Sequence, residues 1–193
     1  MLDIKSIIEE NITTQKTILN MCVNDIYDAT IILSKAINAD NKILWCGNGG
    51  SAADAQHMAA ELMGGLTTHD RPPIASIALT TDTSFITAWS NDTDYNAIFS
   101  RQIEGIGKDG DILIAISTSG NSINIINAIK AAKVKKMKVI ILTGETGGKM
   151  HGHGDVQISI PSNNTQRIQE GHLLVEHILC EFVEMGIIQN NKQ

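Results

Sequence analysis

The stretch KILWCGNGGSAADAQH, residues 42–57, decides the fold class. It starts as a short apolar run, continues through a glycine-rich turn and then enters residues that favour a helix. Glycines in such a turn let backbone N–H groups approach a ligand closely, and the start of the next helix favours an anion. A strand, a glycine turn and a helix in succession are typical of a parallel α/β sheet with a ligand site at the turn.

The rest of the chain repeats this alternation. Further apolar runs of strand length lie at 74–79, 111–117, 138–143 and 155–160. Helix-like stretches separate or follow them at 51–63, 93–107, 122–135 and 166–185. Strands with nearly continuous apolar residues are buried on both faces. The pattern therefore predicts a doubly wound, five-stranded parallel sheet flanked by helices.

The first 38 residues predict a helical extension of this sheet. Apolar residues recur there at three- and four-residue steps, which predicts one long helix or two consecutive helices. This segment carries more apolar surface than a lone domain needs, so we expect it to pack against another subunit. Because the chain has only 3 prolines, no repeats and no low-complexity linker, we predict one domain over 1–193, with a helical segment 1–38 and an αβα sandwich 39–193.

Composition excludes several functional classes. The 193 residues carry a net charge of −6, and their Lys and Arg residues are scattered, which argues against a nucleic-acid partner. No apolar run approaches the roughly 18–20 residues that span a bilayer, so no membrane association is expected. The first residues do not resemble a signal peptide, and three cysteines without CxxC spacing favour reduced thiols in a cytoplasmic protein.

The stretch STSGNS, Ser117 to Ser122, predicts a phosphate site. It follows a strand and precedes a helix, and it holds four hydroxyl groups and a glycine that permits a tight turn. With the helix N-terminus, these groups can hold one phosphate without a basic residue or a metal. The simpler alternative is a serine that only caps the helix, but a cap needs one hydroxyl.

The first glycine turn has an alternative interpretation. Gly47, Gly49 and Ala52 also match the GxGxxG/A pattern of dinucleotide-binding proteins, and Asp82 follows the second strand, where a ribose-binding acid can lie. A dinucleotide enzyme does not need a second phosphate cradle, so the STSGNS loop weighs against this interpretation.

His57 and Glu61 lie four residues apart in the helix that begins at the glycine turn. Such a pair shares one helix face, with Cβ atoms roughly 5–6 Å apart, so it can bind a metal or one side chain can orient the other. At 1.5 Å per residue the pair lies roughly 9–15 Å from the phosphate loop. The alternative is a surface pair without function.

The last helix contributes Gln169, His172 and His177. Gln169 and His177 are separated by roughly 12 Å along a regular helix. At that distance, both side chains reach one small ion only with strain. The spacing leaves two possibilities: their contacts come from different subunits, or only one binds the ion at a time. We interpret His172 as a polar position without a special task.

Several motifs together resemble one family. These are GNGGSAADAQHMAAEL, the SND segment at Ser90–Asp92, ISTSGNS, LTGETGGKM and RIQEGHLLVEHILC. Over nearly its whole length the chain resembles the phosphoheptose isomerases of the sugar isomerase (SIS) domain family.

The resemblance implies an activity and an assembly. The expected enzyme is an aldose–ketose isomerase that converts sedoheptulose 7-phosphate to D-glycero-D-manno-heptose 7-phosphate through an enediol. This is the first step of ADP- or GDP-heptose biosynthesis for lipopolysaccharide or capsule. The resemblance also implies a cytoplasmic homotetramer with active sites at subunit interfaces and one zinc ion per subunit. It leaves open the choice of pathway, whether zinc is essential and which subunit supplies each residue.

The resemblance also implies site residues. The expected acid/base pair is Glu61 and His177. The expected zinc ligands are His57, Glu61, Gln169 and His177. The expected substrate-binding residues are Asn48, Gly49, Gly50, Ser51, Glu61, Asn91, Asp92, Ser117, Thr118, Ser119, Ser122 and Gln169. Gln166 departs from the family pattern, in which several relatives carry Asp, so its role is not implied.

The main alternative from another functional class is a catalytically inactive SIS-domain regulator that binds a phosphosugar or a replication-initiator protein. Such relatives lack the acid at the Glu61 position and the histidine at the His177 position. This chain retains both, which favours the enzyme.

Overall fold

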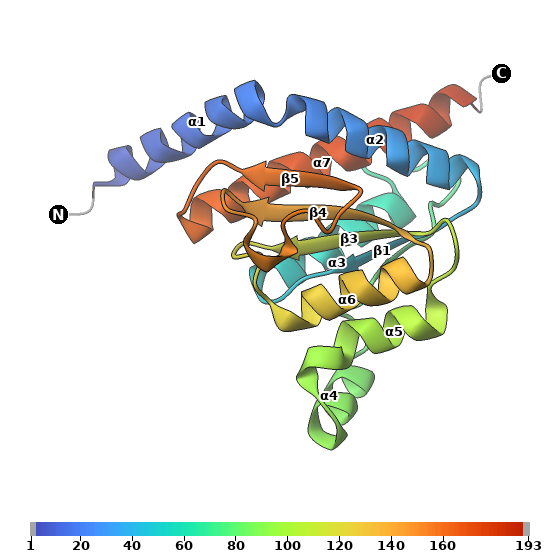
Figure 1. Ribbon diagram of the computed structural model, residues 1–193. Coiled ribbons are helices and arrows are strands. Elements are labelled where there is room, and N and C mark those ends of the chain that lie inside the picture. The colour runs from blue at the N-terminus through green and yellow to red at the C-terminus, as the bar shows by residue number, and fades with distance from the viewer. Residues whose placement is uncertain (1–2, 191–193) are drawn as a thin grey trace.

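The computed structural model describes residues 3–190, without the side chains of 189 and 190. Its centre is a five-stranded parallel sheet with the order β2-β1-β3-β4-β5 (Figure 1). The strands are β1 (Ile43–Cys46), β2 (Ser76–Ala78), β3 (Ile112–Ser117), β4 (Lys138–Gly144) and β5 (Val156–Ile160). The predicted fold class is confirmed, and each strand lies within an apolar run named above or extends it by one residue.

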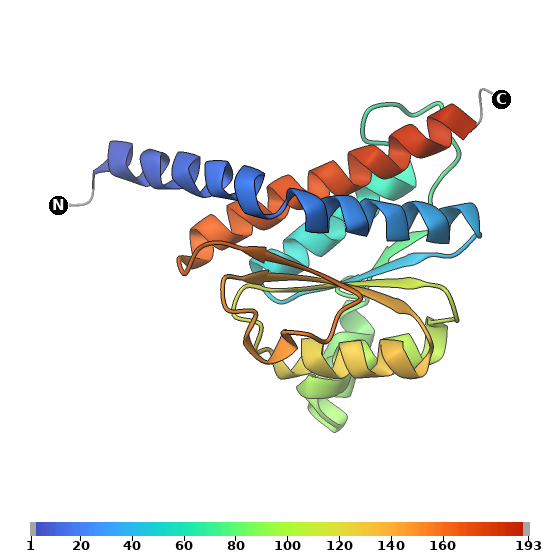
Figure 2. The ribbon, with the colours of Figure 1, turned by 45° about the horizontal axis from the view of Figure 1, so that its top comes forward.

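Helices cover both faces of the sheet. Their bounds are α1 (Ile4–Met21), α2 (Val23–Asn38), α3 (Gly50–Gly64), α4 (Thr83–Asp92), α5 (Ile98–Ile106), α6 (Ile123–Val134) and α7 (Thr165–Asn190), with short 3-10 turns η1 (Tyr95–Ala97) and η2 (Gly148–Met150). Residues of α2, α3 and α7 share one hydrophobic cluster with one face of the sheet, and residues of α5 and α6 share a second cluster with the other face (Figure 2). Because β1 and β3 lie between these two clusters, their residues are buried throughout.

The helix α4 is absent from the sequence prediction, which considered Asp82, at the start of this segment, as a candidate ribose-binding acid. Asp82 begins the helix instead, because its Oδ1 accepts a hydrogen bond from the Phe85 N–H at 2.9 Å. Asp82, the candidate ribose-binding acid of the dinucleotide alternative, therefore serves as an N-cap.

The N-terminal segment forms two consecutive helices, as one of the two expected arrangements. Helix α1 extends past the edge of the sheet layers, whereas α2 lies along α7 and β5 (Figures 1 and 2). Several large apolar side chains of these helices are exposed, including Ile8, Leu19 and Tyr27. Cys22, Cys46 and Cys180 are buried and free. Within residues 3–190, no helix has the length and apolar character needed to cross a membrane.

Candidate active site

The strand order places a crevice between the loops that follow β1 and β3. From β1 the sheet extends to β2 on one side, and from β3 it extends to β4 and β5 on the other. Ligands of doubly wound sheets bind at such a reversal, beyond the carboxyl ends of the strands. The loops 47–50 and 118–122 both reach this point, as predicted, and line one pocket there.

Glycine is required in the first loop because other groups approach its backbone. Gly49 has φ +58°, a left-handed conformation that side chains rarely adopt. A Cβ atom on Gly50 would collide with Nε2 of Gln169, and one on Gly47 would collide with the backbone of Ser51. The requirement for glycine is therefore strict at Gly47 and Gly49, whereas at Gly50 the flexible end of the Gln169 side chain can move aside.

The pocket between the two loops has a volume of about 110 Å³. It unites most of the predicted substrate-binding side chains. Its lining consists of Asn48, Ser51, Ile116, Ser117, Thr118, Ser119, Ser122 and Gln169.

The serine hydroxyls of this pocket are arranged for an anion. Ser122 precedes α6 but makes no side-chain capping bond, and its Oγ lies 3.2 Å from Oγ of Ser117. The interpretation of Ser122 as a simple helix cap is therefore wrong. Oδ1 of Asn124 accepts the Ile125 N–H at 3.0 Å, so the N–H groups of Ile123 and Asn124 are the ones in the first turn of α6 that can bind a ligand such as phosphate.

A pair of asparagines joins the two loops. Asn48 donates to Oδ1 of Asn124 at 2.9 Å, and Asn124 donates back to Oδ1 of Asn48 at 2.8 Å. Tyr95 also donates to Oδ1 of Asn48 at 3.0 Å. The Asn48 amide is thus occupied within the chain, so Asn48 fixes the loop. Sequence reasoning missed Asn124 and Tyr95, because only the tertiary structure brings them to Asn48.

Helices α3 and α7 lie side by side and run in the same direction. Gln169 lies at Gly50, the His177 ring lies beside the His57 ring, and the Cys180 thiol lies 3.7 Å from the Met58 sulfur. We call this contact the α3–α7 seam. The candidate acid/base side chains lie along this seam, beyond the serine pocket and toward the carboxyl ends of both helices.

Three predicted catalytic or metal-binding side chains meet on the seam. Nε2 of His57 lies 3.1 Å from Oε1 of Glu61. The rings of His57 and His177 are edge to face with centroids 5.1 Å apart. Nδ1 of His177 lies 2.8 Å from the Leu173 carbonyl oxygen, so Nδ1 carries the proton and Nε2 is left as a free acceptor. One chain therefore brings together His57, Glu61 and His177.

This cluster suits zinc in its chemistry. Two imidazoles and a carboxylate are common zinc ligands, and a carbonyl on the remote nitrogen of His177 is the usual outer contact of a ligating histidine. Within the described residues, however, no three His, Cys, Asp or Glu side chains already form a metal-binding group. Closing the three side chains around an ion therefore requires changes in side-chain conformation.

Gln169 does not lie in this cluster within one chain. Its amide covers Gly50 and lines the serine pocket, whereas His177 lies beside His57. The predicted separation of Gln169 and His177 along their helix thus corresponds to two different places on the seam.

Two further carboxyl groups belong to the seam. Asp54 is partly buried, and burial raises its pKa against the opposing effect of His57 and His177. Glu176 is fully buried, and neither of its carboxyl oxygens has a hydrogen-bond partner in the described part of the chain. Burial, and then the nearby Asp54, raise the pKa of Glu176 to about 8. Neither was a candidate from the sequence, because the burial of a carboxyl group becomes visible only in the packed structure.

His172 has a structural task. It is fully buried, and its Nε2 donates to the Thr143 carbonyl oxygen at 3.0 Å, which links α7 to β4. Burial lowers its pKa to about 4, so the ring is neutral at physiological pH. It lies outside the lining of the serine pocket.

Three other positions lie outside the pocket lining. Asn91 and Asp92 end α4 on the surface, where Asn91 donates to Oδ1 of Asp92 at 2.7 Å. Gln166 is exposed in the first turn of α7. The substrate contacts expected for Asn91 and Asp92 stay predictions.

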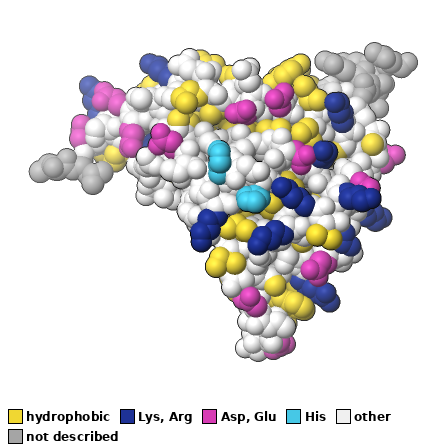
Figure 3. All heavy atoms as spheres, in the orientation of Figure 1, with side chains coloured by type: hydrophobic (Ala, Val, Ile, Leu, Met, Phe, Trp, Pro, Cys, Tyr) yellow, Lys and Arg dark blue, Asp and Glu magenta, His cyan; other side chains and the backbone are white. Residues whose placement is uncertain are grey.

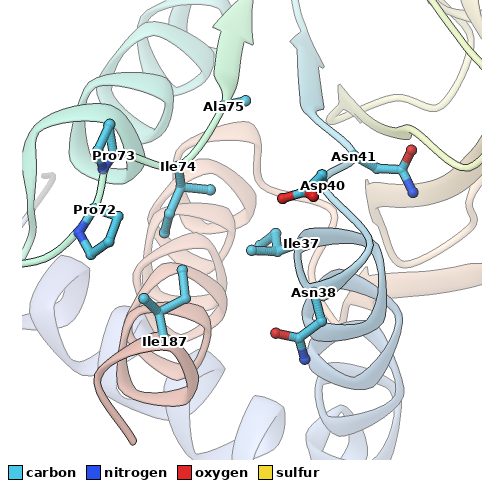
Figure 4. A pocket seen from close by; sticks show the side chains of 9 residues that line it. All are labelled: Ile37, Asn38, Asp40, Asn41, Pro72, Pro73, Ile74, Ala75 and Ile187. Atoms are coloured by element: carbon cyan, nitrogen blue, oxygen red, sulfur yellow. The ribbon is translucent and has the colours of Figure 1, made fainter. Parts of the chain in front are cut away.

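A larger pocket, of about 380 Å³, opens near the amino-terminal ends of β1 and β2 (Figure 4). Isoleucine and proline side chains form much of its wall, with Asn38, Asp40 and Asn41 at one side. None of the predicted site residues lines it. Chemistry and strand topology favour the serine pocket and the seam as the functional site, despite the smaller volume there.

Comparison with protein families adds independent findings. The SIS domain family matches residues 7–144. A phosphoheptose isomerase of Shewanella sp. strain ANA-3 is 48% identical over 193 residues, covering 98% of each chain. A phosphoheptose isomerase of Coxiella burnetii is 44% identical over 187 residues, covering 95% of this chain and 94% of its own.

Among solved structures, the chain is again similar to phosphoheptose isomerases. A phosphoheptose isomerase from Neisseria gonorrhoeae superposes with a TM-score of 0.87 at 41% identity, covering 94% of this chain and 97% of its own. One from Francisella tularensis superposes with a TM-score of 0.90 at 37% identity, covering 94% and 96%.

Proposed function

The chain belongs to the SIS domain family and, within it, to the phosphoheptose isomerases, and on that basis we propose that it converts sedoheptulose 7-phosphate to D-glycero-D-manno-heptose 7-phosphate. As a member it is an aldose–ketose isomerase. The proposed reaction moves a proton between C1 and C2 through an enediol, while the phosphate at C7 holds the substrate.

One observation carries the proposal: the anion pocket and the acid/base cluster lie at two places along the same seam. Ser117 and Ser122 lie at the start of α3 and α7, beside Gln169. His57 and Glu61 lie further along α3, roughly 9–15 Å from Ser51 at 1.5 Å per residue. A heptose 7-phosphate has its phosphate and its reacting carbons at opposite ends of an open chain, as this separation requires.

In the proposed mechanism, Glu61 is the base. Its carboxylate takes the proton from the carbon beside the carbonyl, and the resulting acid returns a proton to the neighbouring carbon. His57, 3.1 Å away, orients the carboxylate. When no metal ion occupies the site, His177 exchanges protons with the substrate oxygens through Nε2, which the bond between Nδ1 and Leu173 leaves free.

We further propose that His57, Glu61 and His177 hold a zinc ion, with Gln169 as the fourth expected ligand. Bound zinc would polarise the substrate carbonyl. The mixed His/Glu donor set supports this proposal. The place of Gln169 at the serine pocket means that its contribution depends on movement or on another subunit.

The proposed assembly is a homotetramer with active sites at subunit interfaces. Apolar side chains on α1 and α2 are exposed on the single chain, and Figure 3 shows such side chains along the top of the molecule. Val23 and Tyr27 of α2 and Phe182 of α7 also line a largely apolar pocket. Exposed apolar surface of this kind favours association.

The proposed place of the enzyme is the cytoplasm, at the first step of ADP- or GDP-heptose biosynthesis for lipopolysaccharide or capsule. Three free thiols are consistent with a reducing compartment.

The test is direct. Purified protein is incubated with sedoheptulose 7-phosphate, and the aldose product is followed by NMR, with and without chelator and added zinc. We expect interconversion to an equilibrium mixture. Binding of the sugar phosphate without turnover under any metal condition would instead support the regulator alternative.

A further inference from the structure

A buried ion pair closes the carboxyl end of the α3–α7 seam. Nε of Arg71, in the loop between α3 and β2, donates to Oε1 of Glu184 on α7 at 2.7 Å. The two side chains are 1% and 0% exposed. Because breaking a buried pair leaves an uncompensated charge, its presence fixes the loop on α7.

Glu184 binds the loop at three more points. It accepts hydrogen bonds from the backbone N–H groups of Leu66 and Thr67 at 2.9 and 2.7 Å, and from the Thr67 hydroxyl. Burial alone would raise the pKa of Glu184, but the bonds from Thr67, Arg71 and Leu66 lower it to about 2. The carboxylate is therefore charged and fully engaged at physiological pH.

The other end of Arg71 reaches the candidate base. Its Nη2 donates to the backbone carbonyl oxygen of Glu61 at 2.8 Å, and its Nη1 donates to the Pro72 carbonyl at 3.0 Å. The Glu61 carbonyl also accepts the Gly65 N–H at 2.9 Å. The last turn of α3 is thus held at Glu61 by a charged group that is itself held by α7.

This arrangement couples the two halves of the acid/base cluster. Glu61 and His57 stand on α3, and His177 stands on α7, two turns before Glu184. Beyond packing contacts such as Met58 against Cys180, the link from Glu61 through Arg71 to Glu184 joins the helices by directed, charge-assisted bonds.

We infer that Arg71, anchored by Glu184, is a positioning residue that sets Glu61 against His177 for proton transfer. Arg71 does not touch the substrate. Its guanidinium meets a carboxylate and two carbonyl oxygens at once, which the single ammonium of lysine cannot reproduce. The inference rests on the proposed isomerase function.

The test uses Arg71→Lys, which keeps the charge beside Glu184 but cannot also reach the Glu61 carbonyl. We expect kcat on sedoheptulose 7-phosphate to fall by roughly 10- to 100-fold, since small misplacements of catalytic groups have effects of this size. KM should stay within about twofold of the wild-type value, because the serine pocket is untouched. Exchange of solvent deuterium into the substrate should slow in parallel with kcat.

Two controls separate positioning from stability. Asp111 is a matched buried acid: it pairs with Lys42 and accepts the N–H groups of Lys42 and Lys108, at the opposite end of the strands. Asp111→Asn should lower the melting temperature without changing kcat. Thr67→Val removes one bond to Glu184 and spares the Arg71 link to Glu61, so it should also retain kcat.

The outcomes are distinguishable. A folded Arg71→Lys variant with wild-type kcat and exchange rate overturns the inference and leaves the proposed function intact. A loss of kcat in Asp111→Asn equal to that in Arg71→Lys also overturns it, because stability alone would then account for the effect. Wild-type protein without isomerase activity overturns the proposed function and, with it, the inference.

Discussion

The imidazole rings of His57 and His177 lie edge to face, with centroids 5.1 Å apart and planes inclined by 78°. One ring comes from α3 and the other from α7, so their relation depends on how these helices pack. Glu61 joins the pair through its 3.1 Å contact with His57.

Glu61→Gln tests the proposed base. The amide keeps the shape of the side chain but cannot take a proton, so we expect kcat to fall by roughly 100- to 10,000-fold. KM should change little. NMR of the aldose product gives kcat, and titration of the inactive variant with substrate gives its affinity.

The matched control for this variant is Glu104→Gln. Glu104 pairs with Arg101 on the surface, with both side chains 54% exposed, and lies on α5, away from the seam. It should retain wild-type turnover. Near-wild-type turnover of Glu61→Gln would contradict the assignment of Glu61 as the base.

His177→Gln tests the proposed acid. Loss of the imidazole should lower kcat by roughly 100-fold or more, with a matching loss of solvent deuterium exchange. His153→Gln, a change in the exposed loop before β5, is the control and should keep both rates. If His177→Gln exchanges deuterium at the normal rate, His177 is not in the proton path.

The sheet could be predicted from the sequence because its signal is local. Buried parallel strands need continuous apolar residues, and β3 and β4 supply them. Helix α4 could not be predicted in the same way: it spans only Thr83–Asp92, and none of its residues is buried. Its start depends on the Asp82 cap, and in the sequence Asp82 is equally a candidate ribose-binding acid.

Only those parts of the site that a local sequence motif contains could be predicted. The serine loop and the His57–Glu61 pair have local spacing that indicates chemistry. Asn124 and Arg71 have no such signal, because their hydrogen-bond partners lie far away in the chain. A charge within an apolar helix, as at Glu176, becomes informative only when tertiary packing shows that it is buried.

His57→Gln tests the proposed zinc site. Removing one imidazole should weaken zinc by roughly tenfold or more, since even outer contacts of a metal ligand have effects of 10- to 100-fold. Competition against a fluorescent zinc chelator measures the affinity without any reference to activity. His69→Gln, in the loop after α3, is the control. Equal zinc affinity of the His57→Gln and wild-type proteins would contradict the ligand assignment.

Ser122→Ala tests the phosphate pocket. The Ser122 hydroxyl lies beside Ser117 and caps nothing, so its loss should not weaken α6. A hydrogen bond to a charged group contributes about 1.5–3 kcal/mol, so KM should rise by roughly 10- to 100-fold with kcat nearly unchanged. Ser100→Ala on α5 is the control. A fall in kcat without a change in KM would place Ser122 in the chemical step instead.

The lowered pKa of Glu184 predicts how the stability of the protein depends on pH. Its pKa is lowered from the ordinary 4.5 to about 2 in the folded chain. The unfolded state therefore binds the proton more readily, and the stabilisation by this group is present above pH 4.5 and lost as the pH falls toward 2. Glu184→Gln cannot titrate and lacks this contribution at every pH. The difference in urea midpoint between wild type and variant should thus be largest near about pH 6 and shrink by about pH 3. A difference that stays constant over this range would mean that Glu184 is not held as a carboxylate by Arg71 and Thr67.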